Sequence, residues 1–308
     1  AALPVGAIVA GARFVDEPVV ATDDGRVAVT ATVGMIADTA RNVGGDRTRV
    51  AGLMGPGVDP HLYKPSAGDI NRLGDADLIL YGGLHLEGRM AETFEKIRAA
   101  GKPVVAVGEQ VPEELLLRSA DIPGAHDPHI WFDVSLWVYV VEAIARALAE
   151  VAPADAEVFA ANARAYRARL EELDAWVRAE VGRLPASQRV LVTAHDAFGY
   201  FGRAYGFEVV GLQGISTATE AGAGDIQDLA RFLAERKIRA IFVESSVPRA
   251  TVEAVQAATR ARGWDVVIGG ELFSDALGTE GTPEGTYIGM VRHNVTTIVS
   301  ALLGETGA

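Results

Sequence analysis

The chain has 308 residues, contains no cysteine and carries a formal net charge of −13 at pH 7. This length predicts one large domain or two of ordinary size. The lack of cysteine excludes disulfides, thiolate metal ligands and a cysteine nucleophile. The negative charge argues against a nucleic-acid partner, because binding the phosphate backbone needs clustered Lys and Arg. The N-terminal residues 1–15 do not resemble an intact signal peptide, since they lack a basic leader and are broken by glycines.

Short β-branched segments alternate with longer amphipathic segments along the chain, which is typical of a parallel α/β sheet. In chain order, the predicted strands are 27–31, 48–54, 76–83, 102–108, 189–194, 207–213, 238–244 and 264–270. The predicted helices are 34–45, 66–75, 86–101, 134–151, 197–206, 225–237, 248–263 and 286–304. Because the alternation occurs once in each half of the sequence, we expect two doubly wound α/β lobes of similar size.

Residues 154–184 carry apolar residues at spacings of three and four, which predicts one long amphipathic helix. The stripe consists of Phe159, Ala163, Tyr166, Leu170, Leu173, Val177, Val181 and Leu184. Such a helix would span about 45 Å, enough to run along two domains. A coiled-coil dimerisation arm is less favoured, because the polar face lacks a sustained charge pattern. We therefore expect an N-terminal lobe at 26–152, a connecting helix at 153–185 and a C-terminal lobe at 186–308.

The tripeptide Asp-Pro-His occurs twice, ending at His61 and at His129. Proline fixes the backbone that enters the histidine, and the aspartate two residues before the histidine can hold the turn through its side chain. A histidine that is preorganised in this way suits a metal ligand. The alternative interpretation is a turn motif that the chain uses twice.

Four further histidines complete the set of six. His195 follows directly on the predicted strand 189–194, at the edge of an α/β sheet where ligands bind. His85 lies near the start of a predicted helix, His126 just before an Asp-Pro pair, and His293 within the C-terminal helix. For these last three histidines a structural role is favoured.

The three candidate histidines are separated by 68 and 66 residues (129 − 61 and 195 − 129), so only the fold could bring them together. A divalent ion would also need an anionic ligand to offset its charge. Asp275, in "FSDALG" just after the last predicted strand, is one candidate. Glu244 and Glu271, at the ends of two strands, are the competing carboxylates.

Several segments together resemble the zinc- and manganese-binding solute-binding proteins of bacterial ABC transporters, the TroA-like family. The segments are GVDPHLYKPSAGD, NRLGDADLILYGGLHLEG, HDPHIWFD, VTAHDAFGYF, GISTATEAGAGDI, IFVESSVP and LFSDALG. The resemblance implies two small α/β lobes that are joined by one long rigid helix, with the metal in the cleft between the lobes. It also implies that the four metal ligands are His61, His129, His195 and Asp275.

From this resemblance we expect an extracytoplasmic protein, periplasmic or anchored to the cell surface, that delivers Mn²⁺ or Zn²⁺ to a cognate ABC permease. The metal would be a transported ligand, the protein would not be an enzyme, and we expect a monomer. Zinc-dedicated members of the family commonly carry a long His-rich loop, which is missing here, and this departure favours manganese. The distal nitrogens of the imidazoles should be held by further side chains, for which the candidates are Asp127, Asp196, Glu220 and Glu244.

Two other functions are the alternatives. A zinc-dependent metallohydrolase would use Glu244 or Glu271 as its base, but a catalytic zinc keeps one position open for water, and no His-Glu-x-x-His motif occurs. A metal-binding surface adhesin would use the same fold. If imidazoles bind the metal, affinity should fall as the pH drops through about 6.5.

Overall fold

The computed structural model describes residues 25–119 and 122–305. Residues 1–15, for which we predict no intact signal peptide, lie outside this described part. Helix α5 (Ala156–Gly182) divides the chain, and we call the described residues before it the N-terminal half and those after it the C-terminal half. Among the helices of the described residues, none is both long and apolar enough to cross a membrane.

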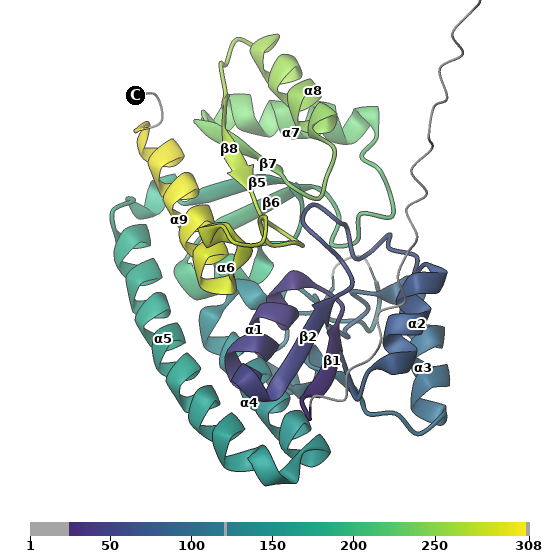
Figure 1. Ribbon diagram of the computed structural model, residues 1–308. Coiled ribbons are helices and arrows are strands. Elements are labelled where there is room, and N and C mark those ends of the chain that lie inside the picture. The colour runs from purple at the N-terminus through teal and green to yellow at the C-terminus, as the bar shows by residue number, and fades with distance from the viewer. Residues whose placement is uncertain (1–24, 120–121, 306–308) are drawn as a thin grey trace, which may run out of the picture.

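Four parallel strands form the sheet of the N-terminal half, in the order β2-β1-β3-β4. These strands are β1 (Val27–Ala31), β2 (Thr48–Gly52), β3 (Leu78–Tyr81) and β4 (Val104–Ala106). The helices are α1 (Gly34–Gly44), α2 (Ala67–Asp75), α3 (Ala91–Ala99) and α4 (Val134–Val151). Parallel neighbours need crossover connections, which α1, α2 and α3 provide. Helices α2 and α3 lie on the other side of the sheet from α1 and α4 (Figure 1).

The C-terminal half repeats this arrangement with two parallel strand pairs, β5-β6 and β7-β8. Its strands are β5 (Val190–His195), β6 (Glu208–Gln213), β7 (Ala240–Glu244) and β8 (Val267–Leu272). Its helices are α6 (Gly199–Tyr205), α7 (Ala223–Arg236), α8 (Arg249–Arg260) and α9 (Tyr287–Leu303). Strands β5 and β7 lie side by side (Figure 1), so the polar ends of both strand pairs meet at one edge.

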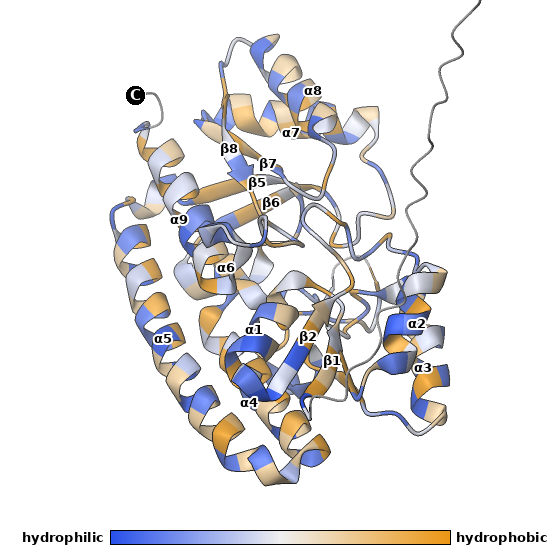
Figure 2. Ribbon diagram, in the orientation of Figure 1, coloured by the Kyte–Doolittle hydropathy of each residue, from blue (hydrophilic) through white to orange (hydrophobic). Residues whose placement is uncertain are grey.

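Helix α5 has 27 residues, which corresponds to a length of about 40 Å. It runs along both halves of the chain and contacts α1, α4 and α9 (Figure 1). Its buried residues are Phe159, Ala163, Tyr166, Leu170, Leu173, Val177 and Val181, all of which belong to the predicted stripe. Figure 2 shows hydrophobic and hydrophilic residues alternating along this helix. Because the stripe is buried within its own chain, it is not available to form a coiled-coil arm.

Buried apolar residues of both halves form one continuous cluster with helix α5. The cluster extends from Val29 on β1 through Leu170 on α5 to Ile298 on α9. A second cluster, which includes Val192 and Ile241, lies within the C-terminal half. The mixed α/β fold with parallel strands and one long helix is confirmed. The division into lobes at 26–152 and 186–308 stays a prediction.

Two predicted elements begin three or more residues later in the structure than expected, at Ala91 and at Val267, and each difference has a tertiary cause. The helix expected at 86–101 begins only at Ala91, after a short 3₁₀ turn. The buried carboxylate of Glu87 accepts hydrogen bonds from the backbone N–H groups of Gly82 (2.7 Å) and Gly83 (3.2 Å). These bonds stabilise a turn in which His85 has a φ of 68°, a left-handed conformation that no helix can contain.

The strand expected at 264–270 instead spans Val267–Leu272, with two glycines in its interior. A Cβ atom added to Gly269 would lie 2.6 Å from the Cβ of Ala301 on α9 and 2.8 Å from Phe242 on β7. The strand therefore needs glycine for close packing against its neighbours. This need is visible only when the helix and the strand are placed together.

Candidate metal centre

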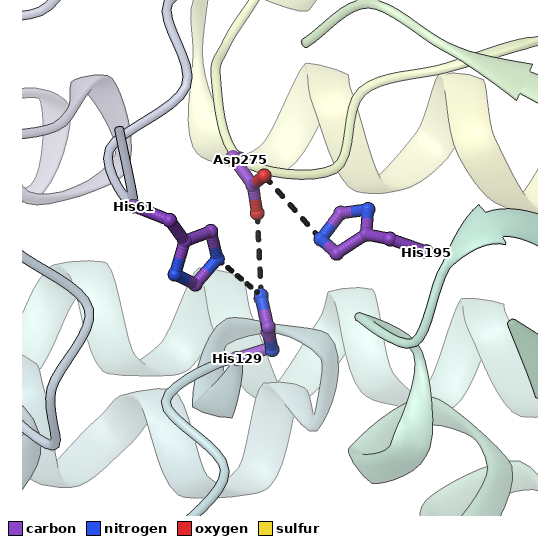
Figure 3. Close-up of side chains that lie close together, drawn as sticks. All are labelled: His61, His129, His195 and Asp275. Carbon is purple, nitrogen blue, oxygen red and sulfur yellow. Dashed lines mark hydrogen bonds and ion pairs between the residues drawn. The ribbon is translucent and has the colours of Figure 1, made fainter. Parts of the chain in front are cut away.

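Four polar side chains meet where strands and loops of the two halves end. His61 lies in the loop after β2, His129 precedes α4, His195 is the last residue of β5, and Asp275 follows β8. Each offers one ligand atom, and these four atoms all lie within 4.8 Å of one another. Within the described residues, this is the one group of three or more His, Asp or Glu side chains with such spacing. Figure 3 shows the four side chains directed towards a common centre.

The four side chains lie close together but do not form a closed hydrogen-bond network. The Nε2 atoms of His61 and His129 are 3.3 Å apart. Asp275 places Oδ1 3.3 Å from His129 Nε2 and Oδ2 3.4 Å from His195 Nε2. His195 Nε2 and Asp275 Oδ1 are nevertheless buried without a hydrogen-bond partner in the described part of the chain. Such unsatisfied polar atoms are costly, and a cation at their centre would satisfy them.

Burial is nearly complete at all four residues. His129 and His195 have no exposed surface, Asp275 is 1% exposed and His61 is 7% exposed. A buried charge is stable only when it is paired or binds a metal. The group is therefore a buried candidate site for one small cation.

Two carboxylates hold imidazoles through the nitrogen that faces away from the centre. Asp127 accepts from the backbone N–H of His129 (2.9 Å) and contacts its Nδ1 (2.7 Å). Glu244 contacts the same two groups of His195 but with two oxygens: Oε1 accepts from the backbone N–H (2.9 Å) and Oε2 contacts Nδ1 (2.5 Å), whereas Asp127 uses Oδ1 for both contacts. Each bond to Nδ1 leaves Nε2 to face the centre, as in the carboxylate–histidine–zinc arrangement of metal sites. Of the four predicted orienting candidates, the structure places these two beside the rings, whereas Glu220 is exposed.

The first Asp-Pro-His tripeptide is used differently from the second. Asp59 Oδ1 accepts from the backbone N–H of His61 at 2.8 Å, as Asp127 does for His129. Its other oxygen accepts instead from the hydroxyl of Thr217 in the C-terminal half, at 2.5 Å. No local sequence pattern indicates this contact, because Thr217 is 158 residues away.

Asp275 is positioned by one contact within the C-terminal half and by one contact between the two halves. The Ser246 hydroxyl donates to Asp275 Oδ2 at 3.2 Å. The indole N–H of Trp131 donates to the carbonyl of Ser274 at 2.9 Å, so the loop that carries Asp275 is bound to the segment just after His129. The competing carboxylate of Glu271 belongs to an exposed residue.

The two histidines of the Asp-Pro-His tripeptides have opposite pKa shifts. Burial lowers the pKa of His61 to about 3, so this imidazole is neutral at neutral pH. Burial acts in the same direction at His129, but the charges and hydrogen bonds of Asp127 and Asp275 outweigh it and raise the pKa to about 9. His129 is therefore protonated at pH 7 when no metal is bound.

His195 and Asp275 form a second charged pair in the site. Burial opposes protonation of His195, but Glu244 and Asp275 raise its pKa well above the usual value. Burial also opposes ionisation of Asp275, yet His195 and His129 hold the pKa of this carboxyl well below its usual range. A divalent cation would replace the protons on the two imidazoles, since metal ligands must be deprotonated.

The other three histidines lie outside this centre. His85 is exposed in its left-handed turn. His126 pairs with Arg118 in an isolated antiparallel bridge. His293 Nε2 lies 3.0 Å from the carbonyl oxygen of Glu271. The structural roles that the sequence favours for these three histidines stay a prediction.

Comparison with known families identifies the class of protein that this fold and this site define. The ZnuA family, described as zinc-uptake complex component A periplasmic, matches residues 29–301. The chain belongs to this family, and the resemblance inferred from its sequence segments is confirmed.

Individual relatives match over nearly their whole length. The zinc-binding protein TroA of Treponema pallidum is 56% identical over 284 residues, which cover 92% of this chain and 91% of the relative. The manganese-binding lipoprotein MntA of Bacillus subtilis is 48% identical over 279 residues, with coverage of 91% and 90%. The solved structure of the periplasmic zinc-binding protein TroA from Treponema pallidum superposes with a TM-score of 0.88 at 55% identity, covering 90% of this chain and 99% of that one.

Proposed function

We propose that the protein captures one divalent transition-metal ion, zinc or manganese, outside the cytoplasm and delivers it to a cognate ABC permease. The ligands are His61, His129, His195 and Asp275. The observation that carries this proposal is the convergence of four buried ligand atoms within 4.8 Å, drawn from both halves of the chain. Family membership and the names of the relatives support the transport role.

The donor set bears on which metal is bound. Three neutral imidazoles and one carboxylate give a net charge of about +1 with a divalent ion. Intrinsic affinity for such a nitrogen-rich site should be higher for zinc than for manganese. Relatives at similar identity are named for zinc and for manganese, and metal supply decides occupancy as much as affinity does. The missing His-rich loop still favours manganese as the physiological cargo.

The site chemistry supports binding rather than catalysis. A catalytic zinc needs a coordination position for water, whereas four protein ligands here surround one small centre. Glu244, the base of the hydrolase alternative, is engaged by the backbone N–H and the ring of His195. The family is one of solute-binding components, and no observation favours an adhesin.

The surroundings of the protein follow from the same proposal. The family description is periplasmic, and the MntA relative is a lipoprotein, which supports a periplasmic or surface-anchored location. The partners are the metal ion and the permease, and the charge of −13 is unsuited to nucleic acid. A monomeric state stays a prediction.

Two measurements test this function. Crystals soaked in zinc or manganese should show one anomalous-scattering peak between the four ligands. A competition titration with a chelator should give one ion per chain for each metal, with zinc bound more tightly. An ion at a different position, or a stoichiometry of zero, would contradict the proposal.

A further inference from the structure

His61 lies in the connection between β2 and α2, residues 53–66. This connection contains no helix or strand, and it is the longest such connection that contributes a proposed ligand. Both ends of this loop are fixed. The N–H of Leu53 donates to the carbonyl of Ala31 at 2.9 Å, and Ser66 and Asp69 form a capping box at the start of α2. Long loops of this kind are commonly functional. The middle of the loop needs contacts of its own if the ring of His61 is to stay in place.

The carboxylate that precedes His61 supplies such a contact. Asp59 fixes the backbone of His61 through Oδ1 and accepts the hydroxyl of Thr217 through Oδ2, at 2.8 and 2.5 Å. Asp127 contacts the ring of His129 through the same Oδ1 that holds the backbone N–H, and Glu244 directs its second oxygen to the ring of His195. Asp59 directs its second oxygen to the opposite half of the chain. His61 is therefore positioned through its loop, whereas the other two rings are held directly.

Thr217 is well placed to act on His61. It is buried, with 7% exposure, and lies four residues after Gln213, the last residue of β6. Gln213 is the register partner of His195, and its carbonyl accepts from the N–H of Asp196 at 3.1 Å. The bond between Thr217 and Asp59 thus joins the loop of one metal ligand to the strand pair that carries another.

His61 also lies at the edge of the site. It is 7% exposed, whereas His129 and His195 are fully buried. The same loop passes close to the C-terminal half at Gly57, where an added Cβ would lie 3.2 Å from the carbonyl oxygen of Ser245. An ion that leaves the centre past its least buried ligand must displace this loop.

We propose that Asp59 and Thr217 form a positioning pair that holds His61 against the metal and limits the rate of metal release. This inference rests on the proposed function. When the bond is present, the loop is attached to both halves and His61 is preorganised, which lowers the entropic cost of binding. When the bond is lost, Asp59 still holds the backbone turn, but the loop detaches from the C-terminal half and His61 leaves the metal more often.

The test compares two substitutions of Thr217 in the full chain loaded with Zn²⁺. Thr217→Val keeps the shape and removes the hydroxyl, whereas Thr217→Ser keeps the hydroxyl. Release is followed by stopped-flow transfer of zinc to a chromogenic chelator. We expect release from Thr217→Val to be about tenfold faster, because a buried hydrogen bond to a charged group is lost. Thr217→Ser should release zinc at close to the wild-type rate.

A second comparison separates positioning from a general loss of stability. In a His61→Ala background, Thr217→Val should no longer change the release rate, because the ligand on which it acts is gone. In a His126→Ala background, it should keep its full effect. Thr217→Ala, which also removes the hydroxyl, replaces Thr217→Val if the valine variant does not fold.

The outcomes distinguish this inference from the proposed function. Wild-type protein that binds zinc while Thr217→Val releases it at the wild-type rate overturns the positioning pair alone. Equal acceleration with and without His61 also overturns it, since the effect would then not pass through His61. Wild-type protein that binds no zinc overturns both.

Discussion

The two Asp-Pro-His tripeptides are identical in sequence, yet the fold uses them in different ways. In both, the aspartate accepts from the backbone N–H of the histidine, at 2.8 Å for His61 and 2.9 Å for His129. Asp127 also contacts the ring of its own histidine with that same oxygen, Oδ1, whereas Asp59 reaches Thr217 with its second oxygen, Oδ2. A local motif therefore fixes the turn that presents an imidazole. The surrounding fold decides whether the ring is held directly or through its loop.

The largest expected effect is the loss of the directly held ring. His129→Ala removes one of four ligands and leaves Asp127 and Asp275 buried without their imidazole. We expect zinc affinity to fall by more than about 100-fold, beyond the range for residues that only orient a ligand. Competition titration with a chelator measures this change. His126→Ala is the matched control and should leave affinity unchanged, and equal losses in the two variants would contradict the assignment.

Acidification should act on zinc affinity through His129 but not through His61, because the pKa values of the two imidazoles differ. His129 has a raised pKa of about 9, so below pH 9 the metal must displace a proton from it, and affinity falls about tenfold per pH unit. His61, with a pKa of about 3, contributes nothing in this range. Zinc affinity should therefore fall by about 100-fold between pH 8 and pH 6 from His129 alone, with His195 adding to the loss.

The raised pKa of His129 has the opposite effect on the stability of the metal-free protein: this stability decreases as the pH rises, whereas zinc affinity increases. Protonated His129 stabilises that state below its unfolded pKa of about 6.5, and the contribution is lost as the pH rises through about 9. Affinity and metal-free stability should thus change in opposite directions between pH 6 and pH 9. The sequence alone predicts that affinity declines near pH 6.5. The carboxylates around His129 raise the pH at which this decline begins. An affinity that stays flat from pH 8 to pH 6 would argue against imidazole ligation.

Neutralising the orienting carboxylate should give the next largest effect. In Asp127→Asn, the amide no longer stabilises the ring orientation electrostatically, and we expect affinity to fall about 10- to 100-fold. Its dependence on pH should also become shallower, because the pKa of His129 is no longer raised by that charge. Asp59→Asn is the comparison, since its side chain contacts the backbone of His61, and it should cost less affinity. Equal losses in the two variants would show that the two tripeptides act alike, and a larger loss for Asp59→Asn would contradict the prediction.

The smallest expected change in affinity comes from Tyr200→Phe on α6. The Tyr200 hydroxyl accepts from the N–H of Leu117 (3.0 Å) and donates to the carbonyl of Asp127 (2.9 Å). Its removal takes this partner from one buried and one part-buried backbone group and should lower the free energy of unfolding by about 1–3 kcal/mol. Denaturant unfolding measures this loss. Zinc affinity should change little, because Asp127 still holds His129, and a large fall in affinity with unchanged stability would contradict this view.

Much of the fold follows from the sequence, because hydrophobic periodicity is a local signal. The alternation of strands and helices and the stripe of α5 are both visible in it. The errors arise where distant atoms decide the local structure. The turn before α3 depends on the buried carboxylate of Glu87, and the interior glycines of β8 depend on the approach of α9 at Ala301.

The candidate site shows the same limit. The three proposed histidine ligands can be selected from the sequence because histidine is rare and each lies at a strand end or in a rigid tripeptide. The choice of Asp275 over Glu244 and Glu271 comes from the family resemblance. The orienting residues could not be ranked, because Asp127 and Asp59 have the same local sequence. Only the position of Thr217 in the opposite half separates their roles.

The apolar cluster that joins both halves through α5 restricts how far the molecule can open. A hinge motion that separated the halves would bring part of this cluster into water, at a cost of about 2.5 kcal/mol for each 100 Å² of apolar surface. A motion that exposed about 400 Å² would cost about 10 kcal/mol, which is comparable to the whole binding energy of a structural zinc ion, about 10–16 kcal/mol. The metal-loaded and metal-free forms should therefore differ by movements of small amplitude. A permease that distinguishes the two forms must recognise local differences on the protein surface rather than a change in overall shape.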